Sequence, residues 1–188
     1  MALQKADVSR EAEVAALAEA AFARFGGVHL LCNNAGVGLT RVTWEHSTAD
    51  WEWVLGVNLW SVIHGIHHFL PKMLEQGDEG HIVNTSSVAG LLSTPGMAAY
   101  NVSKHGVVTL SETLFGELAA AKARVGVSVL CPGIVATNLH ANTVKIGGES
   151  NDDPSKKPAP TVTADEIGQM VIDAIENDEA VIVTDKGF

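Results

Sequence analysis

A tyrosine and a lysine one helical turn apart, Tyr100 and Lys104, are the residues of this chain best suited to chemistry. On a helix, side chains at positions i and i+4 share one face, so the lysine ammonium would lie beside the phenol. A free tyrosine ionises near pH ~10 and is a poor base at neutrality, whereas a fixed positive charge nearby lowers its pKa. The spacing therefore predicts a proton-transfer pair, with Tyr100 as general acid and base and Lys104 lowering its pKa.

A serine, Ser87, precedes this pair and follows the apolar residues Ile82 and Val83. If those two mark a strand of a parallel sheet, Ser87 lies at its carboxyl end, where open α/β sheets bind their ligands. Serine, tyrosine and lysine would then converge on one cleft. The same Tyr-x-x-x-Lys spacing also occurs where a solvated lysine merely follows a packed tyrosine, so the interpretation depends on the neighbouring motifs.

The rest of the chain alternates helical and strand patterns, which is typical of a doubly wound parallel α/β sheet, a Rossmann-like fold. We expect Ala2 to Val8 to end a strand, Ser9 to cap a helix, and Val28 to Cys32 to form a strand buried on both faces. The further elements expected are a long helix from Ser47 or Thr48 to about Gly77, a helix after Tyr100, a strand over Val125 to Cys131, a helix capped by Thr163 and Glu166, and a last strand over Ala180 to Thr184.

Composition bounds the class of protein. The 188 residues, 46% of them hydrophobic, can bury one sizeable core, so we expect a single domain over residues 1–188. The formal net charge of -10 argues against nucleic acid or an anionic membrane as the main partner. No apolar run reaches the ~20 residues that span a membrane, so we predict a cytoplasmic protein. Cys32 and Cys131 fall in apolar runs and are predicted to be buried thiols.

Two more motifs flank the candidate site: the turn Asn33-Asn34-Ala35-Gly36 upstream and Pro132-Gly133-Ile134-Val135-Ala136-Thr137 downstream. Together with Ser87 and Tyr-x-x-x-Lys, they resemble the short-chain dehydrogenase/reductase family over nearly the whole chain. The resemblance implies an oxidoreductase that transfers hydride between a nicotinamide cofactor, NAD or NADP, and an alcohol or ketone. The residue that selects between the two cofactors is not in the sequence.

The resemblance also assigns roles. It implies that Ser87 bonds the substrate oxygen, that Tyr100 exchanges its proton, and that Lys104 also holds the nicotinamide ribose. Asn58, in a Val-Asn-Leu setting, would bend its helix and anchor a water beside the lysine. The residues implied to contact the cofactor, besides Tyr100 and Lys104, are Asp7, Val8, Asn34, Ala35, Gly36, Pro132, Gly133, Ile134 and Thr137.

One part of the family pattern is missing from the sequence. Members begin with a strand and a glycine-rich turn that holds the cofactor pyrophosphate at a helix N-terminus. The nearest candidate here, Gly36 to Arg41, lacks the third glycine. We therefore expect an N-terminally truncated domain without its first two βα units. Such a chain would not be a competent dehydrogenase alone, and its Val28 to Cys32 strand would expose an apolar edge.

A broken, polar stretch from His140 to Val162 contains three prolines and a pair of adjacent glycines. Its composition predicts a flexible or disordered segment, and the resemblance implies a mobile lid over the substrate.

Self-association is expected from the helices over Asn58 to Leu74 and Tyr100 to Leu118, which carry more apolar surface than one sheet face covers. The resemblance implies a homodimer or homotetramer. An alternative to the enzyme is therefore a structural or interaction module that keeps these helices and has lost the redox site.

Two other functions are disfavoured. A serine hydrolase would need Gly-x-Ser-x-Gly, and Thr85-Ser86-Ser87-Val88 does not match it. The histidines His64, His67 and His68 share a helix, but no cysteine or carboxylate nearby in the sequence completes a metal site, so no metal is predicted.

Overall fold

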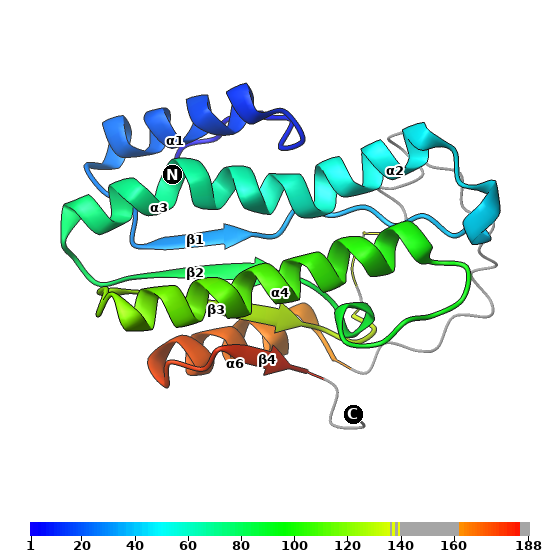
Figure 1. The fold of residues 1–188 in the computed structure, drawn as a ribbon. Coiled ribbons are helices and arrows are strands. Elements are labelled where there is room, and N and C mark those ends of the chain that lie inside the picture. Colours follow the sequence, from blue (N-terminus) through cyan, green and yellow to red (C-terminus); the bar gives the residue numbers. More distant parts are fainter. Residues whose placement is uncertain (136, 138, 140–161, 185–188) are drawn as a thin grey trace.

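The computed structural model describes residues 1–135, 137, 139 and 162–184 (Figure 1). Within these residues, parallel strands form a four-stranded sheet in the order β1-β2-β3-β4. The strands are β1 (Leu30–Asn33), β2 (Gly80–Thr85), β3 (Val125–Cys131) and β4 (Val181–Val183). Strands consecutive in the chain are neighbours in the sheet, with a helix between each pair, as expected for a Rossmann-like fold.

Helices cover the two faces of this sheet. On one face lie α1 (Glu11–Phe25), α3 (Ser61–Gln76) and α4 (Ala98–Ala120), and on the other lies α6 (Ala164–Glu176). Adjacent residues of β2 show the division, because Ile82 packs in the cluster formed by α1, α3 and α4 whereas Val83 packs with Ala174 of α6. Side chains alternate across a strand, so each strand contributes to both layers. The predicted doubly wound α/β sheet is confirmed.

The long helix predicted to start near Ser47 has three parts. Ser47 and Asp50 form a capping box at the start of α2 (Thr48–Leu55), residues Gly56–Trp60 form a π-helical turn, and α3 ends where Gly77 takes a φ of 75°. Asn58, which the family resemblance implies bends its helix, lies in this π-helical turn. A π-bulge inside an α-helix is frequently associated with a functional site.

The beginning of the chain differs from expectation. Residues 1–7 carry no regular structure, so the strand predicted over Ala2 to Val8 is wrong. Ser9 does not cap α1 either, because its hydroxyl donates to the Asp7 carboxylate at 2.7 Å, and Arg10 occupies the N-cap position without a side-chain cap. The Asp7 amide instead donates to Glu13 of the first turn at 2.7 Å. A local side-chain bond has replaced the expected cap.

Strand β1 lies at the end of the described sheet and is less buried than predicted. Leu30 keeps 51% of its surface exposed, and Cys32 is exposed as well. Helix α6 packs over β3 and β4 rather than β1, since its Ala174 contacts Leu130 and Ile182. The predictions that this strand is buried on both faces and that Cys32 is a buried thiol are therefore wrong, whereas Cys131 is buried as predicted.

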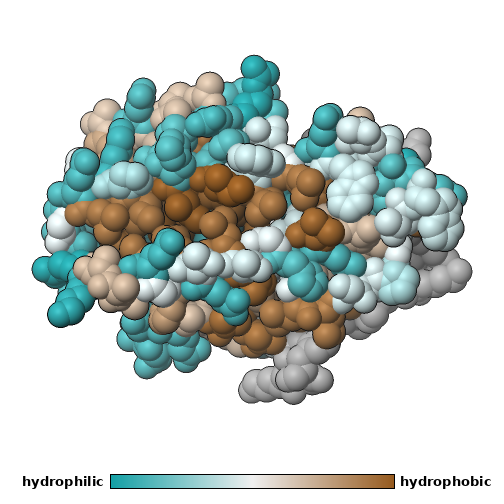
Figure 2. All heavy atoms as spheres, viewed as in Figure 1, coloured by the Kyte–Doolittle hydropathy of each residue, from teal (hydrophilic) through white to brown (hydrophobic). Residues whose placement is uncertain are grey.

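The last helix and strand follow the prediction. Thr163 and Glu166 form the predicted capping box at α6. The segment predicted to be a lid lies outside the described residues, except for Val162, which bridges to Val135. In the described part of the chain no helix is both long and apolar enough to cross a membrane. Figure 2 shows an apolar band on the face formed by α3 and α4.

Candidate active site

Tyr100 and Lys104 lie in the first two turns of α4 and share one face, as predicted. Both are buried, with 7% and 4% of their surfaces exposed. The Lys104 Nζ lies 5.6 Å from the centroid of the Tyr100 ring. It donates a hydrogen bond of 2.9 Å to the carbonyl oxygen of Thr85, the last residue of β2. The end of the strand therefore fixes the position of the ammonium.

Burial determines the protonation of this lysine. It lowers the pKa of Lys104 to about 8, because a charged ammonium loses its hydration, and nearby Cys131 opposes part of this shift. Lys104 is therefore charged at neutral pH but close to its titration range.

Ser87 joins the end of β2 to the tyrosine. Its Oγ accepts from the Ala89 amide at 3.1 Å and lies 3.4 Å from the Pro132 carbonyl oxygen. Burial raises the pKa of Tyr100, and the hydrogen bond with the Ser87 side chain partly offsets this rise. The i, i+4 spacing predicts that Lys104 lowers this pKa. The net direction is the opposite, because the loss of hydration on burial outweighs the hydrogen bond with Ser87.

Two further serines hold this arrangement and were missed by the sequence analysis. Ser86 Oγ donates to the Lys104 carbonyl at 2.8 Å, and Ser103 Oγ donates to the Tyr100 carbonyl at 2.7 Å. Gly90, after Ser87, approaches α4 so closely that a Cβ there would lie 2.8 Å from the Lys104 carbonyl oxygen. The signals available in the sequence were the serine pair at the end of the strand and the serine between Tyr100 and Lys104.

Asn58 is fully buried and connects the π-helical turn to the site. Its Oδ1 accepts from the Val37 amide at 2.8 Å, and its Nδ2 donates to the Val37 carbonyl at 2.9 Å and to Ser103 Oγ at 3.1 Å. Both amide protons are used, but Oδ1 keeps one lone pair. A Cβ at Gly36 would lie 3.6 Å from that oxygen and 3.7 Å from the Lys104 Nζ. The structure thus brings Asn58 and Lys104 to the same turn.

That turn contains three of the predicted cofactor residues. Asn34 follows β1 and accepts a hydrogen bond of 3.1 Å from the Thr85 hydroxyl, Ala35 is exposed, and Gly36 lies against Asn58 and Lys104. Because β1 and β2 are adjacent and parallel, their carboxyl ends bring the Asn-Asn-Ala-Gly turn to the end of the strand that positions Lys104.

The predicted residues after β3 are less firmly held. The Pro132 carbonyl accepts from the Val88 amide at 3.0 Å, and the Gly133 amide donates to Thr184 at 3.1 Å. Ile134 is 43% exposed. Thr137 is exposed, and its hydroxyl accepts only a long bond of 3.4 Å from the Leu139 amide. Pro132 thus joins the site directly, whereas Ile134 and Thr137 lie on an exposed connection.

Asp7 and Val8 lie at the start of α1. The Asp7 carboxylate accepts from Ser9, which lowers its pKa, and Val8 packs partly against the core under α1 and α3. Ser9 reaches the π-helical turn, since its Cβ lies 3.4 Å from where a Cβ of Gly56 would be. Within the described residues, no hydrogen bond joins Asp7 or Val8 to the Asn34 to Gly36 turn.

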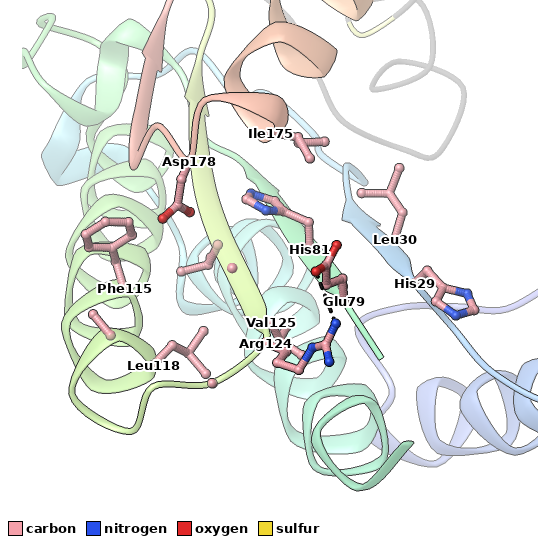
Figure 3. Close-up of a pocket in the computed structure, with 15 residues that line it drawn as sticks. His29, Leu30, Glu79, His81, Phe115, Leu118, Arg124, Val125, Ile175 and Asp178 are labelled. Carbon is pink, nitrogen blue, oxygen red and sulfur yellow. Dashed lines mark hydrogen bonds and ion pairs between the residues drawn. The ribbon is translucent and has the colours of Figure 1, made fainter. Parts of the chain in front are cut away.

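A separate hollow of about 640 Å³ lies at the opposite, amino ends of the strands (Figure 3). His81 and Ser128 are paired there at 2.8 Å, and Asp178 lies near the imidazole. These are the residue types of a hydrolytic triad, but Ser128 is fully buried and donates its proton to the Glu179 carbonyl at 2.6 Å. An inaccessible hydroxyl that is already donating cannot attack a substrate, so this group stabilises the sheet.

The structure thus places a buried serine, tyrosine and lysine together at the carboxyl ends of the strands of a parallel, Rossmann-like sheet. The chain belongs to the short chain dehydrogenase family, since residues 1–146 match the model of that family.

Relatives agree with this assignment. The chain is 40% identical over 135 residues to a CLA biosynthesis dehydrogenase/reductase of Lactiplantibacillus plantarum, covering 72% of this chain and 47% of that protein. It is 36% identical to a D-beta-hydroxybutyrate dehydrogenase of Rhizobium meliloti, covering 71% of this chain and 51% of that protein. The chain thus spans about half the length of these curated relatives.

A solved structure shows the same fold. A short chain dehydrogenase/reductase from Burkholderia phymatum, determined in complex with NAD, has a TM-score of 0.89 and 41% identity, with 98% of this chain and 70% of that chain covered.

Proposed function

We propose that this chain carries the catalytic centre of an NAD(P)-dependent oxidoreductase that interconverts an alcohol and a carbonyl compound, with Tyr100 as general acid and base. The observation that carries the proposal is the buried contact of Tyr100 with Ser87, with Lys104 one turn further along α4. Membership of the short chain dehydrogenase family supports it.

The residues present fit a nicotinamide ribose. Within the described residues Lys104 donates one hydrogen bond, to Thr85, so two N–H groups of its ammonium are left for ribose hydroxyls. The absence of a side chain at Gly36 leaves room beside Lys104 for a ligand to approach the backbone. Pro132 to Thr137 would border the nicotinamide ring. The cofactor would supply or accept the hydride.

The protein side chains would handle the proton. Ser87 and Tyr100 together would donate to the substrate oxygen, and burial keeps Tyr100 protonated at neutral pH, which suits it to act as the acid in carbonyl reduction. A water between Asn58 Oδ1 and the Lys104 Nζ could then resupply the proton, since both atoms face the position beside Gly36. Asn58 would act in this relay through its remaining lone pair.

Substrate and cofactor identity are proposed only as classes. Leu91 and Leu92, which follow the Ser87 turn, expose 41% and 47% of their surfaces and would favour an apolar small-molecule substrate. The Burkholderia phymatum relative was determined in complex with NAD, so NAD is the first cofactor to test with this chain. NADP is to be tested beside it.

We also propose that the chain self-associates. The alternative function, a structural module without a redox site, would keep this self-association. Trp60 and Leu74 are 51% and 43% exposed, and the apolar band of Figure 2 lies along this face. The second stripe of α4 contributes less than expected, because Val108 is 7% exposed and Phe115 packs partly into the core. Trp60→Glu is therefore the better probe, and an unaltered mass by light scattering would count against this interface.

The decisive experiment uses a chimera in which the amino-terminal segment of the Burkholderia phymatum relative precedes Met1, because the family resemblance implies that this segment holds the cofactor pyrophosphate. We expect it to bind NADH or NADPH and to reduce a carbonyl substrate. Tyr100→Phe should lower turnover by about 10² to 10⁴ and leave cofactor affinity nearly unchanged, since only the hydroxyl is removed. More than about a tenth of the activity remaining would show that Tyr100 is not the acid. Intact assembly without nucleotide binding would favour the module.

A further inference from the structure

A carboxylate of α1 and two histidines of α3 lie together on the surface away from the redox site. One ligand atom each of Glu11, His67 and His68 lies within 4.8 Å of the other two. The helices pack against each other through a shared cluster that includes Val14 and Phe69. The sequence disfavours a metal here because no carboxylate is near these histidines along the chain. That reason was wrong, since helix packing places Glu11 beside them.

The surroundings of the His68 ring nitrogen favour a bound ligand. Its Nε2 is buried and makes no hydrogen bond, although it lies 3.4 Å from Glu11 Oε1. A buried polar atom without a hydrogen bond is costly and needs an explanation. A metal ion would occupy the lone pair of this nitrogen and the carboxylate oxygen at once.

The two histidine rings of the cluster lie side by side on α3. His67 and His68 are arranged edge to face, with ring centroids 4.7 Å apart. Two imidazole nitrogens and a carboxylate oxygen that converge in this way are donor atoms that bind divalent transition-metal ions.

We propose that Glu11, His67 and His68 bind one divalent transition-metal ion, with water completing the coordination. Two imidazole nitrogens and one carboxylate oxygen form the ligand set that Zn²⁺ accepts in open four-coordinate sites, at about 2.0–2.2 Å per ligand. Ligand atoms of such a site lie roughly 3.4 Å apart, so small rotations of the exposed Glu11 and His67 side chains would close the set. The ion would tie the first turn of α1 to α3.

This site is independent of the proposed dehydrogenase function. The test is calorimetric titration with Zn²⁺ of the 188-residue chain, purified without a histidine tag, together with thermal unfolding with and without the ion. We expect one Zn²⁺ per chain and a rise in the unfolding midpoint. His67→Ala and His68→Ala should each weaken binding by more than about tenfold and abolish the rise. Glu11→Gln should weaken binding less than either, because a neutral oxygen remains.

A matched control is His29→Ala. His29 lies 3.5 Å from the Asp78 carboxylate and is exposed, but no second histidine of the described residues joins that pair. Its removal should change the affinity by no more than about twofold. Unchanged affinity in both His67→Ala and His68→Ala, or an equal loss in His29→Ala, would overturn the site.

A variant that unfolds without metal would leave the titration hard to interpret, so Co²⁺ is added to the unaltered chain as a second probe. The visible spectrum should be that of a four-coordinate nitrogen and oxygen site. The spectrum of hydrated Co²⁺ at equimolar ion would contradict the proposal.

Discussion

The two sides of the candidate site are held very differently. Ser87, Tyr100 and Lys104 are each at most 9% exposed, and hydrogen bonds of 3.1 Å from the Ala89 amide to Ser87 and of 2.9 Å from Lys104 to the Thr85 carbonyl hold the serine and the lysine. On the cofactor side, Ile134 is 43% exposed and Thr137 makes only a long contact with the next turn. The residues that we propose for proton transfer are therefore preorganised by the fold, whereas residues that would face the nicotinamide lie on an exposed connection.

This difference implies that the chemistry and the cofactor contacts can be damaged separately. Substitutions in the buried group should change turnover or the stability of the fold, because each removes an atom that the fold has positioned. Substitutions after Pro132 should change cofactor affinity alone. The predictions below test that separation in the chimera described above, in order of decreasing effect.

Lys104→Met should have the largest effect, lowering turnover by about 10³ and weakening NADH binding as well, because the ammonium would serve both the proton path and the ribose. Lys72→Met is the control, since Lys72 lies on α3 over the ring of Phe22 and should leave both quantities unchanged. Steady-state kinetics and calorimetric titration measure them. A loss of rate with unchanged affinity would contradict the ribose role.

Ser87→Ala should lower turnover by about 10², the value typical of one hydrogen-bond donor to a reacting oxygen. Ser86→Ala provides the contrast within the same serine pair, because its hydroxyl bonds the Lys104 carbonyl and faces no substrate. That variant should lose about 1 kcal/mol of stability and less than tenfold in turnover. Equal kinetic losses in the two variants would show that Ser87 has no special position.

Asn58→Ala should cost about 1–3 kcal/mol in the free energy of unfolding, because the buried amide and carbonyl groups of Val37 would lose their partner. Denaturant unfolding measures this, and Asn177→Ala is the control, since Asn177 bonds only the exposed end of α6. Stability within a few tenths of a kcal/mol of the unaltered chain would mean that water replaces the amide.

Thr137→Ala should have the smallest effect, a few-fold loss of NADH affinity at unchanged turnover, as expected for one exposed hydrogen bond. A turnover loss as large as that of Ser87→Ala would remove the distinction between the two sides of the site.

Residues fixed by secondary structure were predictable from the sequence. The i, i+4 spacing placed Tyr100 and Lys104 on one face, and the strand ahead of Ser87 placed that serine at the sheet edge, because both arguments use fixed backbone geometry. The irregular helix at Asn58 was expected from the family resemblance rather than from spacing. The capping box at Thr163 was also predictable, because it involves only residues that are close together in the chain.

Features that depend on packing over long sequence distances were not predictable. The exposure of Cys32 depends on which strands α6 covers, and the rise in the pKa of Tyr100 depends on how much water the folded chain excludes. Glu11 meets His68 only because α1 packs on α3. Ser9 was expected to cap α1, but its hydroxyl donates to Asp7 instead.

We propose that burial holds Ser87, Tyr100 and Lys104 in place and sets their protonation. The effect of Lys104 on stability tests this proposal without any cofactor. The folded-state pKa of about 8 lies below the 10.5 of an unperturbed lysine, so the unfolded chain binds more protons between these values and stability rises with pH. Lys104→Met abolishes this contribution and should be more stable than the unaltered chain at neutral pH, although less active. The measurement is the free energy of unfolding of both chains at pH ~7 and ~9.

Cys131, whose pKa burial raises to about 11, remains neutral when folded over this range and is common to both chains. We predict that the unaltered chain gains about 1 kcal/mol relative to Lys104→Met between the two pH values. An equal change in the free energy of unfolding of the two chains between these pH values would contradict this prediction. So would a Lys104→Met chain that is less stable than the unaltered chain at neutral pH.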